Sequence, residues 1–382
     1  MGPLKDTRII ELAGIGPGPF CATLLADMGA EVIRVDRTRP SGLGLPTETR
    51  FDVLGRNRRS VAIDLKSPDG AEALLKLVER ADALIEGFRP GVVETLGVGP
   101  DVCMSRNKKL VFGRMTGWGQ TGPWASAAGH DINYIALSGA LHAIGSADGP
   151  PIPPLNLVGD FGGGAMFLAV GVLAAMLEAR NSGMGQVVDT SMVEGSAYLS
   201  MMFHGLLAAG SWTEERGRNV VDGGAHFYGV YETKDGKYVS IGSIEAKFYE
   251  LLLERSGADR AKLSDQWTAA DWPAKRKLLE EVFRSKTRDE WDGIMAGTDV
   301  CYAPVLNFSE ATGHPHNKAR GSFIDLNGVT QPGPAPRFSR TQSEVARGPA
   351  IEGEHTNEIL ADWGFGAEEI SRLADAGAVL QA

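Results

Sequence analysis

The sequence has 382 residues, of which 43% are hydrophobic and 23% charged, and these proportions exclude a mainly disordered chain. The 38 Lys and Arg residues are outnumbered by 48 Asp and Glu residues, and the net charge of −10 argues against nucleic acid as a partner. Its three cysteines (Cys21, Cys103 and Cys301) form no CxxC pair, so we expect no disulfide framework, no metal site and a reducing location, the cytoplasm.

The N-terminal part of the chain alternates between apolar strand patterns and helix patterns. Strands that alternate with helices at this spacing favour a parallel sheet with helices on both faces, which defines the α/β class. Glycine accounts for 49 residues, which suggests many tight turns and close approaches of the backbone to a ligand. The predicted strands span residues 8–12, 31–35, 60–65, 83–85 and 110–112, and the predicted helices span 20–28 and 70–80.

The middle of the chain is more helical. The uncharged run 161–177 is only at the lower limit of length for a membrane span, so we interpret the apolar helix predicted at about 165–178 as a buried core helix and expect no membrane partner. A strand at 186–189 and a helix at 193–207 are predicted after it.

A second domain begins near residue 225. Two strand patterns, at 226–233 and 237–243, are joined through Asp235-Gly236, which is a strong hairpin signal. Farther on, Thr287 and Glu290 form a capping-box pattern that predicts a helix start. The predicted domains are a large one at 1–190, a linker helix at 191–219, a small α+β domain at 220–308, a linker at 309–333, and a return to the large domain at 334–382.

The loop from Gly14 to Pro19 follows the first predicted strand and resembles a dinucleotide-binding fingerprint. The third glycine of that pattern is replaced by Pro19, and prolines lack the backbone N–H groups that would hold a pyrophosphate. A tight turn whose backbone lines a ligand is the better interpretation.

Basic residues gather in the first ninety positions of this acidic chain. Several follow predicted strands, at the edge where open α/β sheets bind ligands, and arginine binds phosphate in a bidentate manner. The cluster is therefore a phosphate-binding candidate, with a solvated basic face as the alternative. Its members are Arg34, Arg37, Arg39, Arg50, Arg56, Arg58, Arg59, Lys66 and Arg89.

Two further residues are candidates for chemistry. His130 stands at a predicted helix start, where free backbone N–H groups can receive a developing anion, although its position also suits a structural histidine. Asp160 precedes Phe161 and three consecutive glycines, which let a substrate approach closely, although a turn aspartate would look the same.

Together these segments carry a family resemblance. Glu11–Pro19, Met115–Pro123, Gly129–Tyr134 and Asn156–Asp160 follow one another as they do in the α-methylacyl-CoA racemases, a group within family III of the CoA-transferases. The resemblance runs from about residue 4 to the tail segment Gly353–Thr356.

The resemblance implies an interlocked homodimer with a Rossmann-like large domain and a small α+β domain, acting on 2-methyl-branched acyl-CoA. It implies no metal and no cofactor beyond the CoA thioester, which is the substrate. Thr95 departs from the pattern, because some members carry a basic residue there. The residues implied to hold CoA are Arg37, Ile63, Asp64, Leu65, Lys66, Gly87, Phe88 and Arg89, with Gly129, Asn133 and Tyr134 around the thioester.

Racemisation next to a thioester requires two acid/base groups that flank the α-carbon. The candidates are His130 and Asp160, and the backbone N–H of Asp131 is placed to stabilise the enolate oxygen. The resemblance gives Glu245 the task of orienting the imidazole, whereas its position alone suits a carboxylate that favours the helix dipole. The alternative function is CoA transfer with Asp160 as the nucleophile.

Overall fold

The computed structural model describes residues 2–39, 42, 44 and 47–382. The chain forms two compact units. The large unit comprises Met1–Ser138, Leu155–Leu199 and Ala319–Ala382, and the small unit comprises Gly139–Pro154 and Ser200–Lys318.

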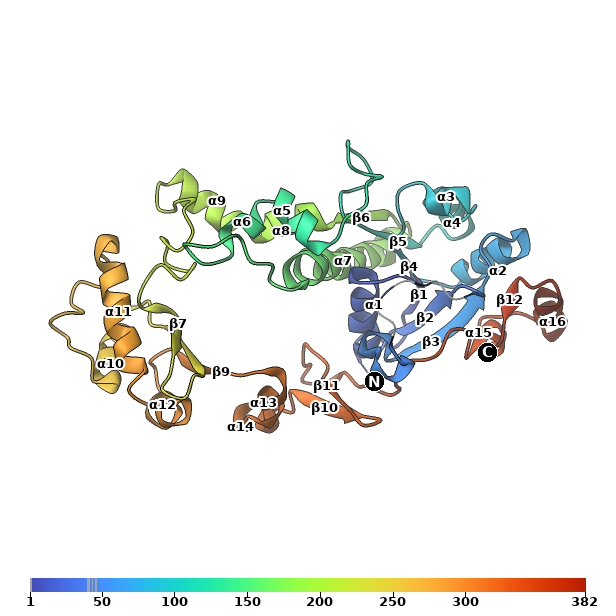
Figure 1. The fold of residues 1–382 in the computed structure, drawn as a ribbon. Helices are drawn as coiled ribbons and strands as arrows, with labels where there is room; N and C mark the ends of the chain where they lie inside the picture. The colour runs from blue at the N-terminus through green and yellow to red at the C-terminus, as the bar shows by residue number, and fades with distance from the viewer. Residues whose placement is uncertain (1, 40–41, 43, 45–46) are drawn as a thin grey trace. The chain divides into compact units, whose positions relative to one another are not determined.

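A seven-stranded sheet forms the centre of the large unit (Figure 1). Its strand order is β12-β3-β2-β1-β4-β5-β6, and every pair is parallel except that of β12 with β3. The order 3-2-1-4-5-6 is that of doubly wound nucleotide-binding sheets, which confirms the predicted α/β class. The strands are β1 (Arg8–Leu12), β2 (Glu31–Asp36), β3 (Arg58–Ile63), β4 (Ala83–Glu86), β5 (Val111–Thr116), β6 (Val187–Ser191) and β12 (Val379–Leu380).

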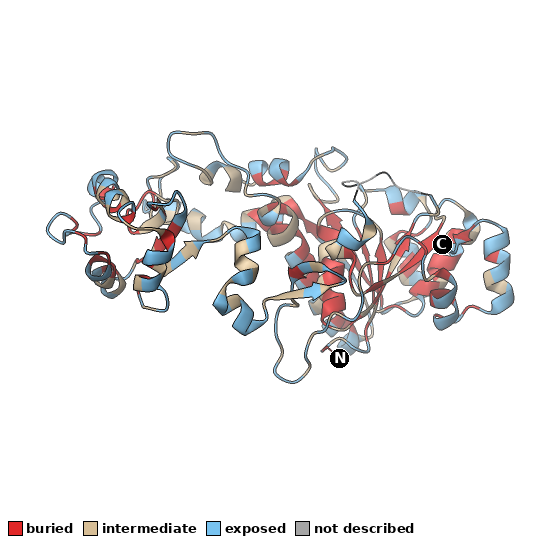
Figure 2. Cartoon of the chain, turned by 60° about the horizontal axis from the view of Figure 1, so that its bottom comes forward, coloured by how far each residue is buried: buried red, intermediate tan, exposed pale blue. Residues whose placement is uncertain are grey.

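Helices cover both faces of this sheet because neighbouring strand residues point to opposite sides. Ile10 belongs to a buried cluster that includes Leu74 and Trp363, whereas Ile9 belongs to another that includes Leu168. The buried residues of this unit gather on the sheet and on the helices beside it (Figure 2). The helices of this unit are α1 (Pro17–Asp27), α2 (Pro68–Val78), α3 (Val92–Thr95), α4 (Pro100–Arg106), α5 (Asp131–Leu137), α7 (Met166–Ser182), α8 (Met192–Leu199), α15 (Thr356–Asp362) and α16 (Ala367–Asp375). Short 3₁₀ turns η1 (Thr49–Phe51) and η2 (Val53–Gly55), a wide π-helical segment η3 (Leu157–Ala165), and a hairpin of β10 (Phe323–Leu326) and β11 (Val329–Pro332) complete it.

The small unit has an antiparallel sheet with helices packed on it. The hairpin predicted at Asp235-Gly236 is confirmed, with Gly236 at a φ of 71°, and a third strand that sequence analysis missed is added to it. Its elements are β7 (Tyr228–Glu232), β8 (Tyr238–Gly242), β9 (Tyr302–Val305), α6 (Ala140–Ala143), α9 (Met201–Ala208), α10 (Ala246–Ser256), η4 (Ala269–Asp271), α11 (Trp272–Phe283), α12 (Arg288–Met295) and α13 (Phe308–Gly313), with α14 (Pro315–Arg320) at its boundary.

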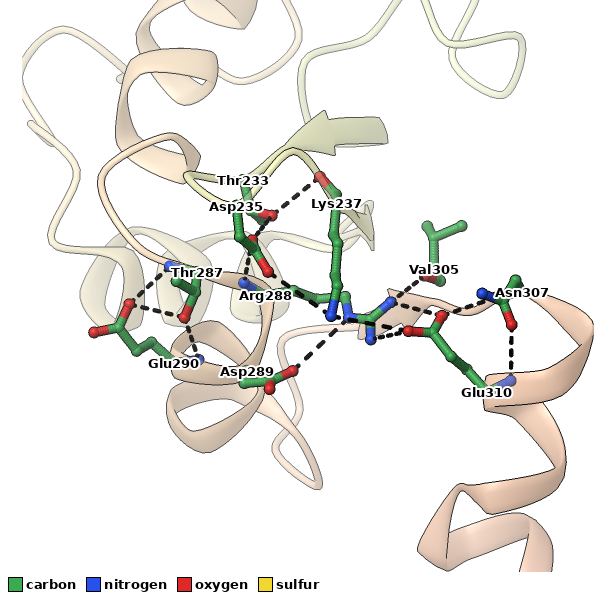
Figure 3. A network of polar contacts seen from close by, with 10 residues as sticks. All are labelled: Thr233, Asp235, Lys237, Thr287, Arg288, Asp289, Glu290, Val305, Asn307 and Glu310. Atoms are coloured by element: carbon green, nitrogen blue, oxygen red, sulfur yellow. Dashed lines mark hydrogen bonds and ion pairs between the residues drawn. The ribbon is translucent and has the colours of Figure 1, made fainter.

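A polar network built on Arg288 holds the end of the small unit together (Figure 3). The Arg288 guanidinium donates to both carboxylate oxygens of Glu310, at 3.0 and 2.7 Å, and to the carbonyl oxygen of Val305 at 3.0 Å. Its backbone N–H donates to Asp235 at 3.0 Å, so the hairpin turn, α12 and α13 are connected. Hydrogen bonds from Arg288 and from the backbone N–H of Asn307 lower the pKa of Glu310 to about 2.

The helix start predicted at Thr287 is confirmed, because its hydroxyl accepts from the Glu290 N–H and the Glu290 carboxylate accepts from the Thr287 N–H. Two other predicted boundaries were wrong. The helix predicted at 20–28 begins at Pro17, because first-turn N–H groups have no intrahelical partner and prolines there cost little. The helix predicted at 193–207 is two helices, α8 and α9, with Ser200 between them.

The helical stretch Leu157–Ser182 is long and apolar enough to cross a membrane by length and composition, with a mean hydropathy of 1.7 in its most apolar window. Core helices of globular proteins meet the same criteria. One face of α7 packs on the sheet, where added Cβ atoms at Gly113 and Gly171 would lie 3.1 Å from Val172 and 2.7 Å from Val188. Only 39% of the window is buried, so the expected core helix leaves much apolar surface exposed.

Candidate active site

The sheet itself indicates where a ligand binds. Strand order reverses between β1 and β4, and open α/β sheets bind ligands at the carboxyl ends of the strands beside such a reversal. The loop 13–16 follows β1, and Gly87–Arg89 follow β4. Both were candidates from the sequence, so the topology brings two separate motifs to one edge.

His130 and Asp131 form the start of α5. His130 is the exposed N-cap residue with extended backbone (φ −133°, ψ 173°), and its backbone N–H donates to Asn133 Oδ1 at 3.0 Å. The first backbone N–H groups of a helix have no intrahelical acceptor. The Asp131 N–H, in the first helical residue, is therefore available to an oxygen with developing negative charge.

Asp160 lies in η3 and is tied to α5 through Asp131. The Asp160 backbone N–H donates to Asp131 Oδ2 at 2.7 Å, and the Asp131 side chain is buried. Gly159 makes this contact possible, because a Cβ there would lie 2.5 Å from Asp131 Oδ2. This hydrogen bond fixes the segment that carries Asp160 relative to the segment that carries His130.

The Asp160 carboxylate is half-buried between the β1 loop and its own segment. Asn156 Nδ2 donates to Asp160 Oδ2 at 3.1 Å, and a Cβ on Gly16, whose φ is 72°, would approach the same oxygen to 3.2 Å. Burial raises the pKa of Asp160, the negative charge of Asp131 adds to the rise, and Asn156 and the positive charge of His130 oppose it. The geometric link between the two residues is the hydrogen bond from the Asp160 N–H to Asp131, the residue after His130.

Tyr134 ties the first turn of α5 to the residue that precedes His130. Its hydroxyl donates to the Gly129 carbonyl oxygen, and its ring meets Trp118 edge-on at a centroid distance of 4.8 Å. Cβ atoms at Gly117 or Gly129 would lie 2.1 or 2.7 Å from the ring, so both glycines are required for its position. Burial, with the Asp160 charge adding to it, raises the pKa of Tyr134 to about 12, so it remains a hydrogen-bond donor.

Three of the predicted CoA-binding cations follow strands at the same sheet edge. Arg37 follows β2, Lys66 follows β3 and Arg89 follows β4, and all three are exposed. Within the described ranges none of them has an acidic partner, so their charge is available to an anionic ligand. Ile63 differs, because its side chain lies in the core and only its backbone could contact a ligand.

Two hydrogen bonds from backbone N–H groups hold the segment around Lys66. The Asp64 N–H donates to the Ala378 carbonyl oxygen at 2.9 Å, and the Lys66 N–H donates to Asp64 Oδ1 at 3.0 Å. Leu65 and Phe88 are partly buried against the same core cluster. These contacts fix the backbone beside the two exposed cations, Lys66 and Arg89.

Five other members of the basic cluster are engaged in ion pairs, so the wider phosphate-binding interpretation was wrong for them. Arg58 and Arg59 also begin β3 and do not follow a strand. The pairs are Arg34 with Asp36 at 2.7 Å, Arg50 with Glu48 at 2.9 Å, Arg56 with Asp27 at 2.6 Å, Arg58 with Glu11, and Arg59 with Glu31, Glu358 and Asp362 at 2.5, 2.7 and 2.6 Å.

Glu245 belongs to the small unit, whereas His130 and Asp160 belong to the large one. It is the exposed N-cap residue of α10, so the predicted helix start after the hairpin is confirmed. Its negative charge contributes to the raised pKa of the Cys301 thiol, for which burial is the larger cause.

Sequence analysis missed an ion-pair cluster next to this edge. Arg114 on β5 contacts Glu86, the last residue of β4, and Glu94 on α3. The available signal was one charged residue in each of two mainly apolar strands, Glu86 at the end of β4 and Arg114 within β5. In the part of the chain that the structure describes, no group of three or more His, Cys, Asp or Glu residues could hold a metal ion.

Comparison with known proteins gives consistent results. Residues 4–356 match the model of CoA-transferase family III. The chain is 46% identical over 373 residues to an α-methylacyl-CoA racemase of Mus musculus (97% of this chain, 96% of that protein). It is 32% identical over 383 residues to a succinyl-CoA–D-citramalate CoA-transferase of Chloroflexus aurantiacus (94% of each). A crystal structure of a CAIB/BAIF family protein from Brucella suis superposes with a TM-score of 0.80 at 25% identity, covering 95% of this chain and 99% of that one.

Proposed function

The chain belongs to the family III CoA-transferases, and within that family we propose that it is a racemase, which interconverts (2R)- and (2S)-2-methylacyl-CoA thioesters. The observation that carries this proposal is that His130, at the start of α5, and Asp160, in η3, lie on segments that the hydrogen bond from the Asp160 N–H to Asp131 joins. A racemase needs two acid/base groups, and a transferase that uses the aspartate as nucleophile needs no second one. The 46% identity to a racemase over 97% of the chain supports the same choice.

Each of the two residues has a distinct role. In one direction the Asp160 carboxylate removes the α-proton and the protonated His130 returns a proton to the opposite face; in the other direction the roles exchange. The raised pKa of Asp160 suits this work, because it makes the carboxylate a stronger base than an ordinary aspartate.

The enolate oxygen that forms between these steps requires a donor. The Asp131 N–H supplies it, because the first helical residue has no intrahelical acceptor and the helix N-terminus favours negative charge. The hydrogen bond from the Asp160 N–H to the Asp131 carboxylate keeps this donor and the aspartate base in a fixed relation. The family resemblance gives Glu245 the task of orienting the His130 imidazole and stabilising its protonated form, as a carboxylate does in a catalytic triad.

The CoA part of the substrate is held at the carboxyl edge of the large sheet. Arg37, Lys66 and Arg89 supply positive charge for the phosphates, and Gly129, Asn133 and Tyr134 surround the thioester. Binding energy from these distant contacts positions the α-carbon between the two acid/base groups.

The active form is a homodimer. Large apolar side chains on α7 and α8 of the large unit are exposed, and an exposed apolar patch on a protein marks an interaction site. A second copy of the chain accounts for the surface that the sheet leaves uncovered on α7. The residues concerned are Val170, Leu177, Tyr198 and Leu199.

The test is incubation with one pure 2-methylacyl-CoA epimer in deuterated water, with and without an acceptor carboxylic acid. We expect both epimers to form and deuterium to enter the α-position without an acceptor. Transfer of CoA to the acceptor, with neither epimerisation nor exchange, would establish the transferase reaction and refute the proposal.

A further inference from the structure

The Glu86 carboxylate lies under the loop Gly87–Arg89 and is shielded from solvent. It ends β4, and its side chain has an exposed fraction of 0%. One oxygen accepts the Phe88 backbone N–H at 2.7 Å and the other accepts Arg114 Nε at 2.9 Å. Both oxygens of this buried carboxylate are therefore used, one by the loop and one by the neighbouring strand.

Arg114 extends this connection to the far end of the loop. Its Nη1 donates to Glu94 Oε1 on α3 at 2.7 Å. The Val92 N–H, at the start of α3, donates to the Arg89 carbonyl oxygen at 3.2 Å. The loop is thus held by Glu86 at its beginning and, through Arg114 and Glu94, by α3 at its end.

The side chain that this arrangement presents is Arg89. The Phe88 ring packs against the core of the large unit, whereas Arg89 is exposed. The positive charge of Arg89 acts on Tyr134 in α5, where it opposes the rise in the pKa of the tyrosine. A change in the loop backbone would displace this cation relative to Tyr134 and the start of α5.

We propose that Glu86 and Arg114 are positioning residues for CoA binding, which act by fixing the loop Gly87–Arg89 so that Arg89 faces the CoA phosphates. This role rests on the proposed function. Neither residue touches the substrate in this scheme. Their contribution is pre-organisation, because a loop that is already ordered loses less freedom when the ligand binds.

Glutamine at position 86 tests the role, because it has one acceptor oxygen for two donors. In Glu86→Gln either the Phe88 N–H or Arg114 Nε must face an amide NH₂ group. The double variant Glu86→Gln with Arg114→Met removes that conflict, because the amide oxygen can turn to Phe88. Glu72→Gln is the matched control: it breaks an exposed ion pair with Arg106.

For each variant, calorimetry measures the dissociation constant of CoA alone. Its kcat and KM for a 2-methylacyl-CoA and its thermal unfolding are measured as well. Glu86→Gln is expected to weaken CoA binding roughly tenfold and to raise KM more than it lowers kcat, which corresponds to loss of one charge-assisted hydrogen bond. The double variant is expected to recover the part of the affinity that depends on the Phe88 hydrogen bond and to retain a loss of about twofold to fivefold, because it lacks the Arg114–Glu94 link. Glu72→Gln is expected to bind as the wild type does. If Glu86→Gln does not fold, the exposed Glu94→Gln takes its place, with an expected loss of about twofold to fivefold.

Wild-type affinity in the folded Glu86→Gln and Glu94→Gln variants would overturn the positioning role while leaving the proposed function intact. Lower thermal stability with an unchanged dissociation constant would overturn it too, since that result shows a purely structural ion pair. Failure of the wild type to bind CoA would instead refute both proposals.

Discussion

At the scale of single residues, the arginines of the basic cluster divide into those with an acidic partner and those without one. Arg37 and Arg89 have no acidic partner among the described residues, whereas Arg59 is neutralised by Glu358 and Asp362, about 300 positions away in the chain. Sequence spacing carries no information on such distant partners. The charges of Arg37 and Arg89 are therefore available to an anionic ligand, whereas tertiary contacts neutralise the charge of Arg59.

Replacing Arg37 or Arg89 by alanine should weaken CoA-thioester binding by roughly 1.5–3 kcal/mol, because each loses a charge-assisted contact to phosphate. The measurement is KM together with the dissociation constant of CoA. Arg260→Ala is the control, because this exposed arginine pairs with Glu250 in the small unit. Unchanged constants in both variants would mean that these cations form only a solvated face.

At the scale of elements, the small unit contains a buried histidine that makes its stability depend on pH. His226 Nε2 donates to the Tyr249 hydroxyl at 2.7 Å, since that hydroxyl itself donates to the Leu263 carbonyl oxygen at 2.8 Å. Burial, with the positive charges of Lys275 and Arg276 adding to it, lowers the pKa of His226 from 6.5 to about 4.

The consequence is a loss of stability in acid. As the pH falls below 6.5, His226 becomes protonated in the unfolded chain, whereas in the folded chain it stays neutral until about pH 4. The free energy of unfolding therefore decreases between pH 6.5 and about pH 4. His226→Gln keeps the donor to Tyr249 but cannot titrate, and should show a shallower dependence. Urea unfolding of the wild type and of His226→Gln at pH 7 and pH 5 measures how much the free energy of unfolding changes with pH. An equal change in the two proteins would contradict this role of His226.

The C-terminal return to the large sheet depends on Trp363, which ends α15. Its side chain is fully buried, and its Nε1 donates to Glu31 at 3.0 Å. Trp363→Ala should lower the free energy of unfolding by roughly 3–5 kcal/mol, because it leaves a large cavity. Phe308→Ala, at a side chain that is 87% exposed, should change it by at most about 0.5 kcal/mol. Equal effects in denaturant unfolding would exclude this anchoring role.

Helices and strands with a strong local sequence pattern could be predicted, whereas those that form only through packing or pairing with another element could not. The strands near Ile9 and Ile33 and the hairpin turn at Gly236 follow from apolar runs and turn residues. The strand Tyr302–Val305 was missed because a proline interrupts it and only its pairing with β8 forms it. For Asp160 a turn aspartate was the structural alternative, but its glycine-rich segment is helical and packs against α8 and α5.

At the scale of the whole molecule, the proposed homodimer would cover the exposed apolar face of α7 with a second copy of the chain. Val170 and Leu177 are each 64% exposed on this helix. Val170→Glu should therefore convert the dimer to monomer, since a charge would be buried at the interface. Val102→Glu, on α4, is the control at an exposed valine. Sedimentation equilibrium of both variants decides this, and a dimer that survives Val170→Glu would place the interface elsewhere.

The central claim is that His130 and Asp160 act as separate acid/base groups on opposite faces of one carbon. The most direct measurement is α-deuterium incorporation into each pure 2-methylacyl-CoA epimer by His130→Ala and Asp160→Ala, with folding checked by circular dichroism. Both variants should lose racemisation, and each should still exchange the α-proton of the one epimer that faces its remaining base. Equal loss of exchange with both epimers in both variants would contradict two independent, face-specific bases.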